Sequence, residues 1–184
     1  MIEIRKYEPK DAAEWDAFVD ASKNGTFMLK RGYLGYHSDR FEDYSLMFFN
    51  DDKLVGLLPA SIHGNELRSH GGLTYGGIIV GNKITVQLEL LLFDAMKTYL
   101  REHNVSNLIY KRVPSIYYRY PSDEDLCALF KNDAKLIQRD VSCTIYQPEK
   151  YVFTERRRRG VKKAIKAGIV VNESDDFYTY MNLV

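Results

Sequence analysis

The pattern of apolar and polar residues predicts strands and helices in a mixed order along the chain. Ile2 and Ile4 alternate with polar neighbours, which predicts a strand at residues 2–7. Pro9 then opens a predicted helix that runs to about residue 21. The most regular helical spacing lies around the middle of the chain. Its apolar positions are Ile84, Leu88, Leu91, Leu92, Ala95 and Tyr99.

The central part of the chain reads as a meander of strands, and the later part alternates strands with helices. The predicted strands lie at residues 44–49, 53–63, 66 onward, 73–80, 106–111, 135–146 and 169–171. A short helix or two turns are predicted at residues 27–37, where Gly32 and Gly35 disfavour a long helix, and a helix is predicted at residues 122–130 with Ser122 as N-cap. This order predicts an α/β (α+β) fold class, with a mixed, mostly antiparallel central sheet flanked by helices.

The end of the sequence begins another helix, with Ser174 or Asp175 as N-cap and with Phe177, Met181 and Val184 on one face. The pattern then stops without a Gly, a Pro or a polar tail. We therefore expect the sequence to be a fragment of a longer protein. A genuine end with a docked terminal helix is the alternative.

Composition fits one substantial domain with a real core, since 45% of the 184 residues are apolar and 13% are aromatic. The sequence contains no run of 18 apolar residues, and its first residues lack the basic-then-apolar pattern of a secretion signal, so we expect a cytoplasmic protein. Cys127 and Cys143 show no spacing typical of a metal site or a disulfide framework, and we expect two buried thiols.

Positive charge is concentrated near the end of the chain. Residues 150–167 hold eight Lys or Arg and one acid, a net +7, whereas the remaining residues hold 18 basic and 24 acidic residues, a net −6. Such an asymmetry favours an anionic partner, for example a nucleotide diphosphate, a coenzyme or RNA. A solvated structural helix is the other interpretation. The candidate anion-binding residues are Arg156, Arg157, Arg159, Lys162 and Lys163.

Cations and aromatic residues also gather at residues 27–37, where we single out Lys30, Arg31, Tyr33, Tyr36 and His37. A lysine supplies a point charge, an arginine a bidentate fork and a tyrosine a stacking face, which together suit a phosphorylated or carboxylated acceptor. Lys30, Arg31 and Tyr36 are our substrate-binding candidates. Alternatively, Tyr33 and Tyr36 are half-buried packing residues.

The third candidate is the glycine-rich stretch before the long helix. Tyr75, Gly76 and Gly77 are interpreted as making room for a substrate, with a bulge or a close backbone approach as the alternative. His70 is the histidine that we expect to face a cleft, although a surface histidine is the other interpretation. The histidines lack metal spacing and there is no G-x-S-x-G motif, so the catalytic residue stays unnamed.

The element order and three segments together resemble a known family. The segments are FMLKRGYLGYHSDRF, LPASIHGNELRSHGGLTYGGIIV and RRRRGVKKAIKAG. They resemble the Fem-type branch of the GNAT acyltransferase superfamily, the peptidoglycan bridge aminoacyltransferases. The resemblance implies two GNAT-like repeats in tandem, with residues 1–150 forming the first and residues 151–184 carrying the basic helix and the start of the second.

The same resemblance implies transfer of an acyl or aminoacyl group to an amine, on a bacterial cell-envelope precursor or another small molecule. The donor would be acyl-CoA or an aminoacyl-tRNA, with no tightly bound cofactor and no metal. This sequence departs from coenzyme-dependent relatives, because Gly76, Gly77 and Gly81 do not have the spacing of their pyrophosphate loop, and coenzyme binding by this half is doubtful. The alternatives are a noncatalytic RNA- or nucleotide-binding module and a degenerate structural repeat.

Overall fold

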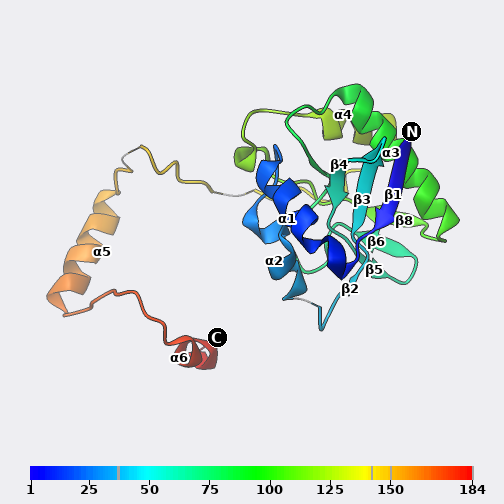
Figure 1. Ribbon diagram of the computed structural model, residues 1–184. Helices are drawn as coiled ribbons and strands as arrows, with labels where there is room; N and C mark the ends of the chain where they lie inside the picture. Colours follow the sequence, from blue (N-terminus) through cyan, green and yellow to red (C-terminus); the bar gives the residue numbers. More distant parts are fainter. Residues whose placement is uncertain (37, 142, 150, 184) are drawn as a thin grey trace. The chain divides into compact units, whose positions relative to one another are not determined.

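The computed structural model describes residues 1–36, 38–141, 143–149 and 151–183 (Figure 1). The described residues divide into two compact units, Met1–Lys135 and Leu136–Val184. The boundary between these units lies earlier along the chain than the boundary at residue 150 that the sequence predicts. His37, one of the predicted cationic candidates, lies outside the described residues. Each unit is described by itself.

The first unit contains eight strands, four α-helices and three 3-10 helices within the described residues. Its strands are β1 (Ile2–Lys6), β2 (Glu42–Asp43), β3 (Leu46–Asn50), β4 (Lys53–Leu58), β5 (Ser61–His63), β6 (Glu66–Arg68), β7 (Ile79–Val80) and β8 (Asn107–Ile109). Its helices are η1 (Pro9–Asp11), α1 (Ala12–Ala21), η2 (Phe27–Leu29), α2 (Arg31–Gly35), α3 (Val86–Glu102), η3 (Ser115–Tyr117) and α4 (Glu124–Lys131).

The strands form two four-stranded sheets, ordered β1-β3-β4-β7 and β2-β5-β6-β8. Two hydrogen bonds join the two sheets where β2 leads into β3 and β4 leads into β5, one between backbone groups and one to a serine hydroxyl. The Tyr44 amide donates to Ala60 O at 2.9 Å, and Ser45 Oγ accepts the Ala60 amide at 3.2 Å. Among the described strands, every pair is antiparallel apart from β6 with β8. The predicted mixed, mostly antiparallel α/β architecture is confirmed.

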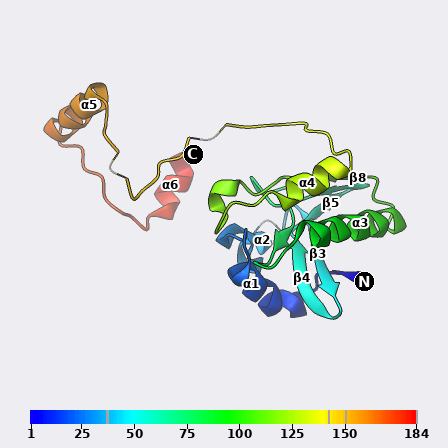
Figure 2. The same ribbon diagram turned by 90° about the horizontal axis from the view of Figure 1, so that it is seen from above.

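Alternation along β3 places helices on both faces of the sheet. Leu46 and Phe48 pack in one buried cluster with residues of α3, and Met47 and Phe49 pack in another with Trp15 of α1. This is the period of two that a strand buried on both faces requires. Figure 2 shows α3 and α4 on one side of the strands and α1 and α2 on the other.

Helix α3 confirms the strongest sequence prediction. Thr85 is its N-cap, and the Thr85 hydroxyl accepts the Leu88 amide at 3.2 Å. Leu92, Met96 and Leu100 recur at the spacing of one helix face and are buried. The predicted helices at Pro9 and in the last residues are also confirmed, by η1 with α1 and by α6 (Phe177–Leu183).

Several local predictions are wrong. Within the described parts of residues 135–146 and 169–171 there is no strand, because these exposed apolar residues have no neighbouring strand with which to pair. Residues 73–80 form a strand only at β7. Asp123 rather than Ser122 is the N-cap of α4. Cys143 is exposed, which corrects the expectation of two buried thiols.

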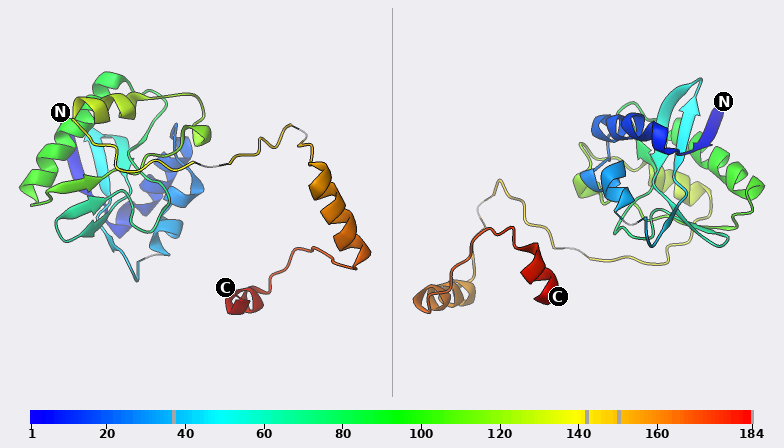
Figure 3. Two further views of the ribbon diagram at one scale, coloured as in Figure 1. Left: turned by 180° about the vertical axis from the view of Figure 1, so that it is seen from behind. Right: turned by 60° about the horizontal axis from the view of Figure 1, so that its bottom comes forward.

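The second unit carries α5 (Glu155–Lys166) and α6, which Figure 3 shows from two further sides. Thr154 caps α5, and its hydroxyl accepts the Arg157 amide at 3.5 Å. Gly168, with a φ of 74°, follows its last turn as a helix-ending glycine. None of the described helices in either unit combines the length and the apolar character that a membrane span needs.

Candidate functional site

Residues 69–78 leave the sheet between β6 and β7. β6 pairs with β5 and with β8, whereas β7 pairs with β4, so the chain changes its neighbours within this glycine-rich excursion. It also contacts the segment that follows β8, where the Gly76 amide donates to Lys111 O at 2.7 Å and Gly76 forms an isolated parallel bridge with Arg112. After this bridge the two parallel segments part, because β7 then pairs with β4.

Gly76 and Gly77 lie against protein atoms. A Cβ on Gly76 would be 2.3 Å from Ser69 O, and a Cβ on Gly77 would be 2.9 Å from the Tyr110 ring. Gly77 also has a φ of 77°, which L side chains rarely adopt. Both contacts agree with the alternative of a close backbone approach. Their predicted role in making room for a substrate stays a prediction.

The outer edge of β7 is closed by residues 22–24, which we call the strap. The Lys23 amide donates to Val80 O at 2.8 Å. The Asn24 side chain donates to Ile78 O and accepts the Val80 amide, both at 2.9 Å. An asparagine side chain thus takes the place of a neighbouring strand, and the backbone groups of this edge are satisfied.

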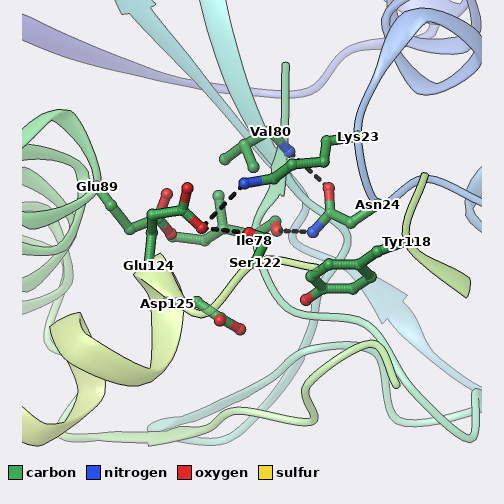
Figure 4. A pocket seen from close by; sticks show the side chains of 9 residues that line it. All are labelled: Lys23, Asn24, Ile78, Val80, Glu89, Tyr118, Ser122, Glu124 and Asp125. Carbon is green, nitrogen blue, oxygen red and sulfur yellow. Dashed lines mark hydrogen bonds and ion pairs between the residues drawn. The ribbon is translucent and has the colours of Figure 1, made fainter. Parts of the chain in front are cut away.

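A small charged cavity lies beneath the strap (Figure 4). Its volume of about 10 Å³ corresponds to a single water molecule, so it is too small for a substrate. Lys23 Nζ lies 3.0 Å from Glu124 Oε2, although the lysine side chain is only 1% exposed. The residues around the cavity are Lys23, Asn24, Ile78, Val80, Glu89, Tyr118, Ser122, Glu124 and Asp125.

Glu89 is the unusual member of this set. It is 1% exposed, and neither carboxyl oxygen has a hydrogen-bond partner among the described residues. Burial, reinforced by the charge of Asp125, raises the pKa of Glu89 to about 8, while Lys23 acts in the opposite direction. Glu89 is therefore a neutral acid at pH 7.

Two tyrosines beside the cavity are also held neutral. Burial is the main cause that raises the pKa of Tyr118 to about 12, and it raises the pKa of Tyr110 well above its usual value. The Tyr110 hydroxyl accepts the Ile78 amide at 3.0 Å. The Tyr110 hydroxyl thus takes the place of a backbone partner for Ile78, just beyond the parallel bridge between Gly76 and Arg112.

The sequence-predicted cations on α2 and before it already have partners. Lys30 Nζ lies 2.7 Å from Asp20 at the surface. The Arg31 guanidinium forms an ion pair with Asp43 and lies 3.5 Å from the centre of the Tyr7 ring. These contacts hold Arg31 in the body of the unit, and an acceptor-binding role for Lys30 and Arg31 stays a prediction.

The predicted tyrosines differ in exposure. Tyr36 is 74% exposed and Tyr33 38%, whereas Tyr75 is only 8% exposed. The Tyr75 hydroxyl lies 3.1 Å from Thr26 Oγ1, and its ring lies 5.4 Å from that of Tyr117. Tyr75 is therefore a packing residue, whereas Tyr33 is partly and Tyr36 largely accessible to solvent.

Two histidines meet at the other end of the glycine excursion. The rings of His63 and His70 each lie 5.8 Å from the ring of Phe41. Ser61 Oγ lies 3.1 Å from His63 Nε2 and accepts the Gly71 amide at 2.9 Å. Because Ser61 is completely buried, this serine and histidine resemble a nucleophile and its base only in distance. His70 is 3% exposed, so it does not face a cleft here.

The candidate anion-binding residues of α5 all lie on exposed positions. Arg158 and Arg159 pair with Glu155 one turn away, at 2.9 and 3.4 Å. Arg156 and Arg157 line a groove on the helix together with Gly160 and Val161. The charge of the helix is thus presented to solvent.

The pattern of the sequence did not indicate the charged groups beneath the strap. Glu89 lies three residues before Leu92 and seven before Met96, on the apolar face of α3. A lone acid on such a face is a signal for a buried carboxyl group. Lys23 and Glu124 carried no comparable signal, because nothing in the pattern joins positions 101 residues apart.

No family model and no curated protein matches the chain. Solved structures that it resembles include the ribosomal-protein-S18-alanine N-acetyltransferase from Escherichia coli, 14% identical, with a TM-score of 0.42 over 59% of this chain and 64% of that one. The ribosomal-protein-alanine N-acetyltransferase from Brucella melitensis biovar Abortus 2308 is 16% identical, with a TM-score of 0.47. The match covers 79% of this chain and 100% of that one. PaiA N-acetyltransferase from Thermoplasma acidophilum, in complex with coenzyme A, is 15% identical, with a TM-score of 0.36. The match covers 57% of this chain and 75% of that one.

The chain thus spans less than two thirds of the first of these structures. All three are N-acetyltransferases by name. All three TM-scores lie below 0.5, so we take the roles of residues from the contacts of this chain alone.

Proposed function

We propose that the chain is one half of a Fem-like acyltransferase of the GNAT superfamily, which transfers an acyl or aminoacyl group to an amine. The acceptor would be a bacterial cell-envelope precursor or a related small molecule. The observation that carries this proposal is the parting of the parallel strands after Gly76 and Arg112, next to a cavity that Ile78 and Val80 share with Glu89 of the first turn of α3. Such a parting is where mixed sheets bind ligands, and a helix N-terminus favours an anionic group.

This half would serve the acceptor rather than the donor. The strap and the Tyr110 hydroxyl fill the parting, and the cavity that remains is of single-water size. The donor, acyl-CoA or an aminoacyl-tRNA, would then be held by a second GNAT-like repeat in a longer protein. Lys30, Arg31 and Tyr36 are the proposed contacts for the acceptor, and the cations of α5 are the proposed contacts for phosphates of tRNA or of the acceptor.

The test is acyl transfer by the protein that contains this chain, with acetyl-CoA and with aminoacyl-tRNA as alternative donors. Lys30→Ala and Arg157→Ala should each lower the rate. Lys10→Ala is the matched control, since Lys10 is an exposed lysine paired with Glu8. Unchanged rates in both variants would remove Lys30 and Arg157 from the site. An increase of KM for aminoacyl-tRNA alone in Arg157→Ala would assign α5 to the donor.

A second candidate is a noncatalytic module that binds RNA through α5. It is favoured by the exposure of the whole basic face of this helix. Its affinity for a bulk tRNA probe should fall steeply with salt. Arg156→Gln with Arg157→Gln should flatten that slope by about 0.7 for each phosphate of single-stranded RNA that the variant no longer neutralises. Salt-dependent tRNA binding together with no acyl transfer from either donor would favour this candidate over the first.

A third candidate is a degenerate repeat whose role is only to support an active partner repeat. Two observations agree with it. The Tyr110 hydroxyl fills the parting of the strands, and Arg31 is already paired with Asp43. Acyl transfer that depends on the presence of this unit but not on Lys30, Arg31 or Tyr36 would distinguish a structural role from acceptor binding.

A further inference from the structure

The neutral carboxyl group of Glu89 lies at the meeting point of three elements. It projects from α3 towards the strap on one side and towards α4 on the other, as the residues around the cavity show (Figure 4). Within the described part of the chain, both of its oxygens are without a partner in a position that is 1% exposed. A buried carboxylate in that state would be costly, whereas a buried neutral acid is tolerated.

The charges that face Glu89 are already matched with one another. From the strap, Lys23 pairs with Glu124 of α4 at 3.0 Å. From the segment after β8, Arg112 pairs with Asp125 at 2.8 Å and with Asp123 at 3.0 Å.

Two phenols, Tyr110 and Tyr118, also lie near Glu89, and their pKa values are raised. They add no positive charge. An ionised Glu89 would therefore add a negative charge with no cation of its own, and it would compete with Glu124 for Lys23.

A water molecule fits this arrangement. The cavity has about the volume of one water, and it is bordered by carboxyl oxygens, the Asn24 amide and the Tyr118 hydroxyl. A neutral Glu89 can donate its proton to such a water, or directly across the cavity. The cavity thus gives the protonated acid room for a hydrogen-bond partner.

We propose that Glu89 is a proton-operated latch for the strap: the protonated acid keeps residues 22–24 closed over the edge of β7, and loss of the proton releases them. Loss of the proton leaves a buried carboxylate without a cation of its own, because Lys23 is paired with Glu124, and opening of the strap admits water to that charge. Release uncovers the Val80 amide and Ile78 O, the two backbone groups that Asn24 holds. The raised pKa of Glu89, about 8, sets the upper end of the pH range in which the change occurs.

The inference does not depend on acyl transfer, because strap opening is measured without donor or acceptor. The measurement is hydrogen exchange of the Val80 amide between pH 6 and pH 9.5, expressed as protection relative to the intrinsic rate at each pH. In the unmodified chain, protection of this amide should fall at least tenfold between pH 6 and pH 8 and change little above pH 8. The Tyr7 amide, which donates to Ser45 O at 2.9 Å, serves as the internal control and should keep its protection.

Glu89→Gln is the decisive variant, because glutamine keeps the shape of the neutral acid and cannot lose a proton in this range. It should keep the Val80 amide protected up to pH 9.5. Glu102→Gln, an exposed change on the same helix, should behave as the unmodified chain. Equal loss of Val80 protection in Glu89→Gln, or a directly measured Glu89 titration near pH 4.5, would overturn the proposal.

Discussion

Asn24 and Val80 are joined by a hydrogen bond of 2.9 Å across 56 residues of sequence, in which the Asn24 side-chain oxygen accepts the Val80 amide. The other end of the same side chain donates to Ile78 O at 2.9 Å. One buried amide therefore completes the edge of β7 as a strand would. This contact explains why the parting of the sheet is closed in this chain.

Asn24→Ala should destabilise the first unit. It leaves the Val80 amide and Ile78 O buried without partners, and each such group costs about 1–3 kcal/mol. We expect the free energy of unfolding in urea to fall by roughly 2–4 kcal/mol. Asn82→Ala is the control, because its side chain makes only a long surface contact of 3.4 Å with Ala21 O. Equal stability of the two variants would contradict the role of Asn24.

Lys23→Met tests the buried ion pair. It leaves Glu124 without its cation inside the junction, and breaking a buried pair from one side costs about 3–5 kcal/mol. Because Glu124 is 22% exposed, we expect the lower end of that range. Urea unfolding at pH 7 measures the loss, with Lys10→Met as the exposed comparison. Adding Glu124→Gln should restore part of the stability; no recovery would mean that the two residues are not coupled.

The stability of the unit should depend on the protonation of Glu89. Its pKa rises from 4.5 in the unfolded chain to about 8 in the folded one. The stabilisation is fully present below pH 4.5 and is lost as the pH rises to 8, because only the folded chain holds the proton in this interval. Each pKa unit corresponds to about 1.36 kcal/mol, so the change is on the order of a few kcal/mol.

Glu89→Gln removes this dependence. Thermal unfolding of both chains from pH 5 to pH 8 should show Glu89→Gln gaining stability relative to the unmodified chain as the pH rises. Parallel pH profiles for the two chains would show that Glu89 is ionised in the folded state.

Gly77→Ala should be poorly tolerated. The new methyl group would meet the Tyr110 ring at 2.9 Å, and the φ of 77° is strained for alanine. We expect a loss of about 1–3 kcal/mol in urea unfolding. Gly81→Ala is the matched change, because a methyl group there has nothing within 4 Å. If both alanines behave alike, the close approach to Tyr110 is not what requires Gly77.

The sequence predicts well those helices and strands whose apolar spacing is contained within the element itself. Helix α3 and strand β1 follow from the spacing of their apolar residues alone. The sequence does not predict strands that depend on a partner. Residues 169–171 have the composition of a strand, but they have no neighbouring strand in the described part of their own unit.

The candidate site is less predictable than the fold for the same reason. The glycines at Gly76 and Gly77 signal a special backbone, but only the position of Tyr110 shows what Gly77 approaches. Arg31 has the residue type of an anion-binding group, and its partners Asp43 and Tyr7 come from distant positions. Pairs such as Lys23 with Glu124 exist only after folding, so periodicity cannot reveal them.

The most direct test of the account is titration of this chain with coenzyme A, followed by calorimetry and by the amide resonances of Ile78, Val80 and Leu88. The account predicts no saturable heat and no shift of these amides at pH 7, because the edge of β7 is closed by Asn24. Saturable binding that shifts the Val80 amide in the closed chain would contradict it, and would place the donor in this half.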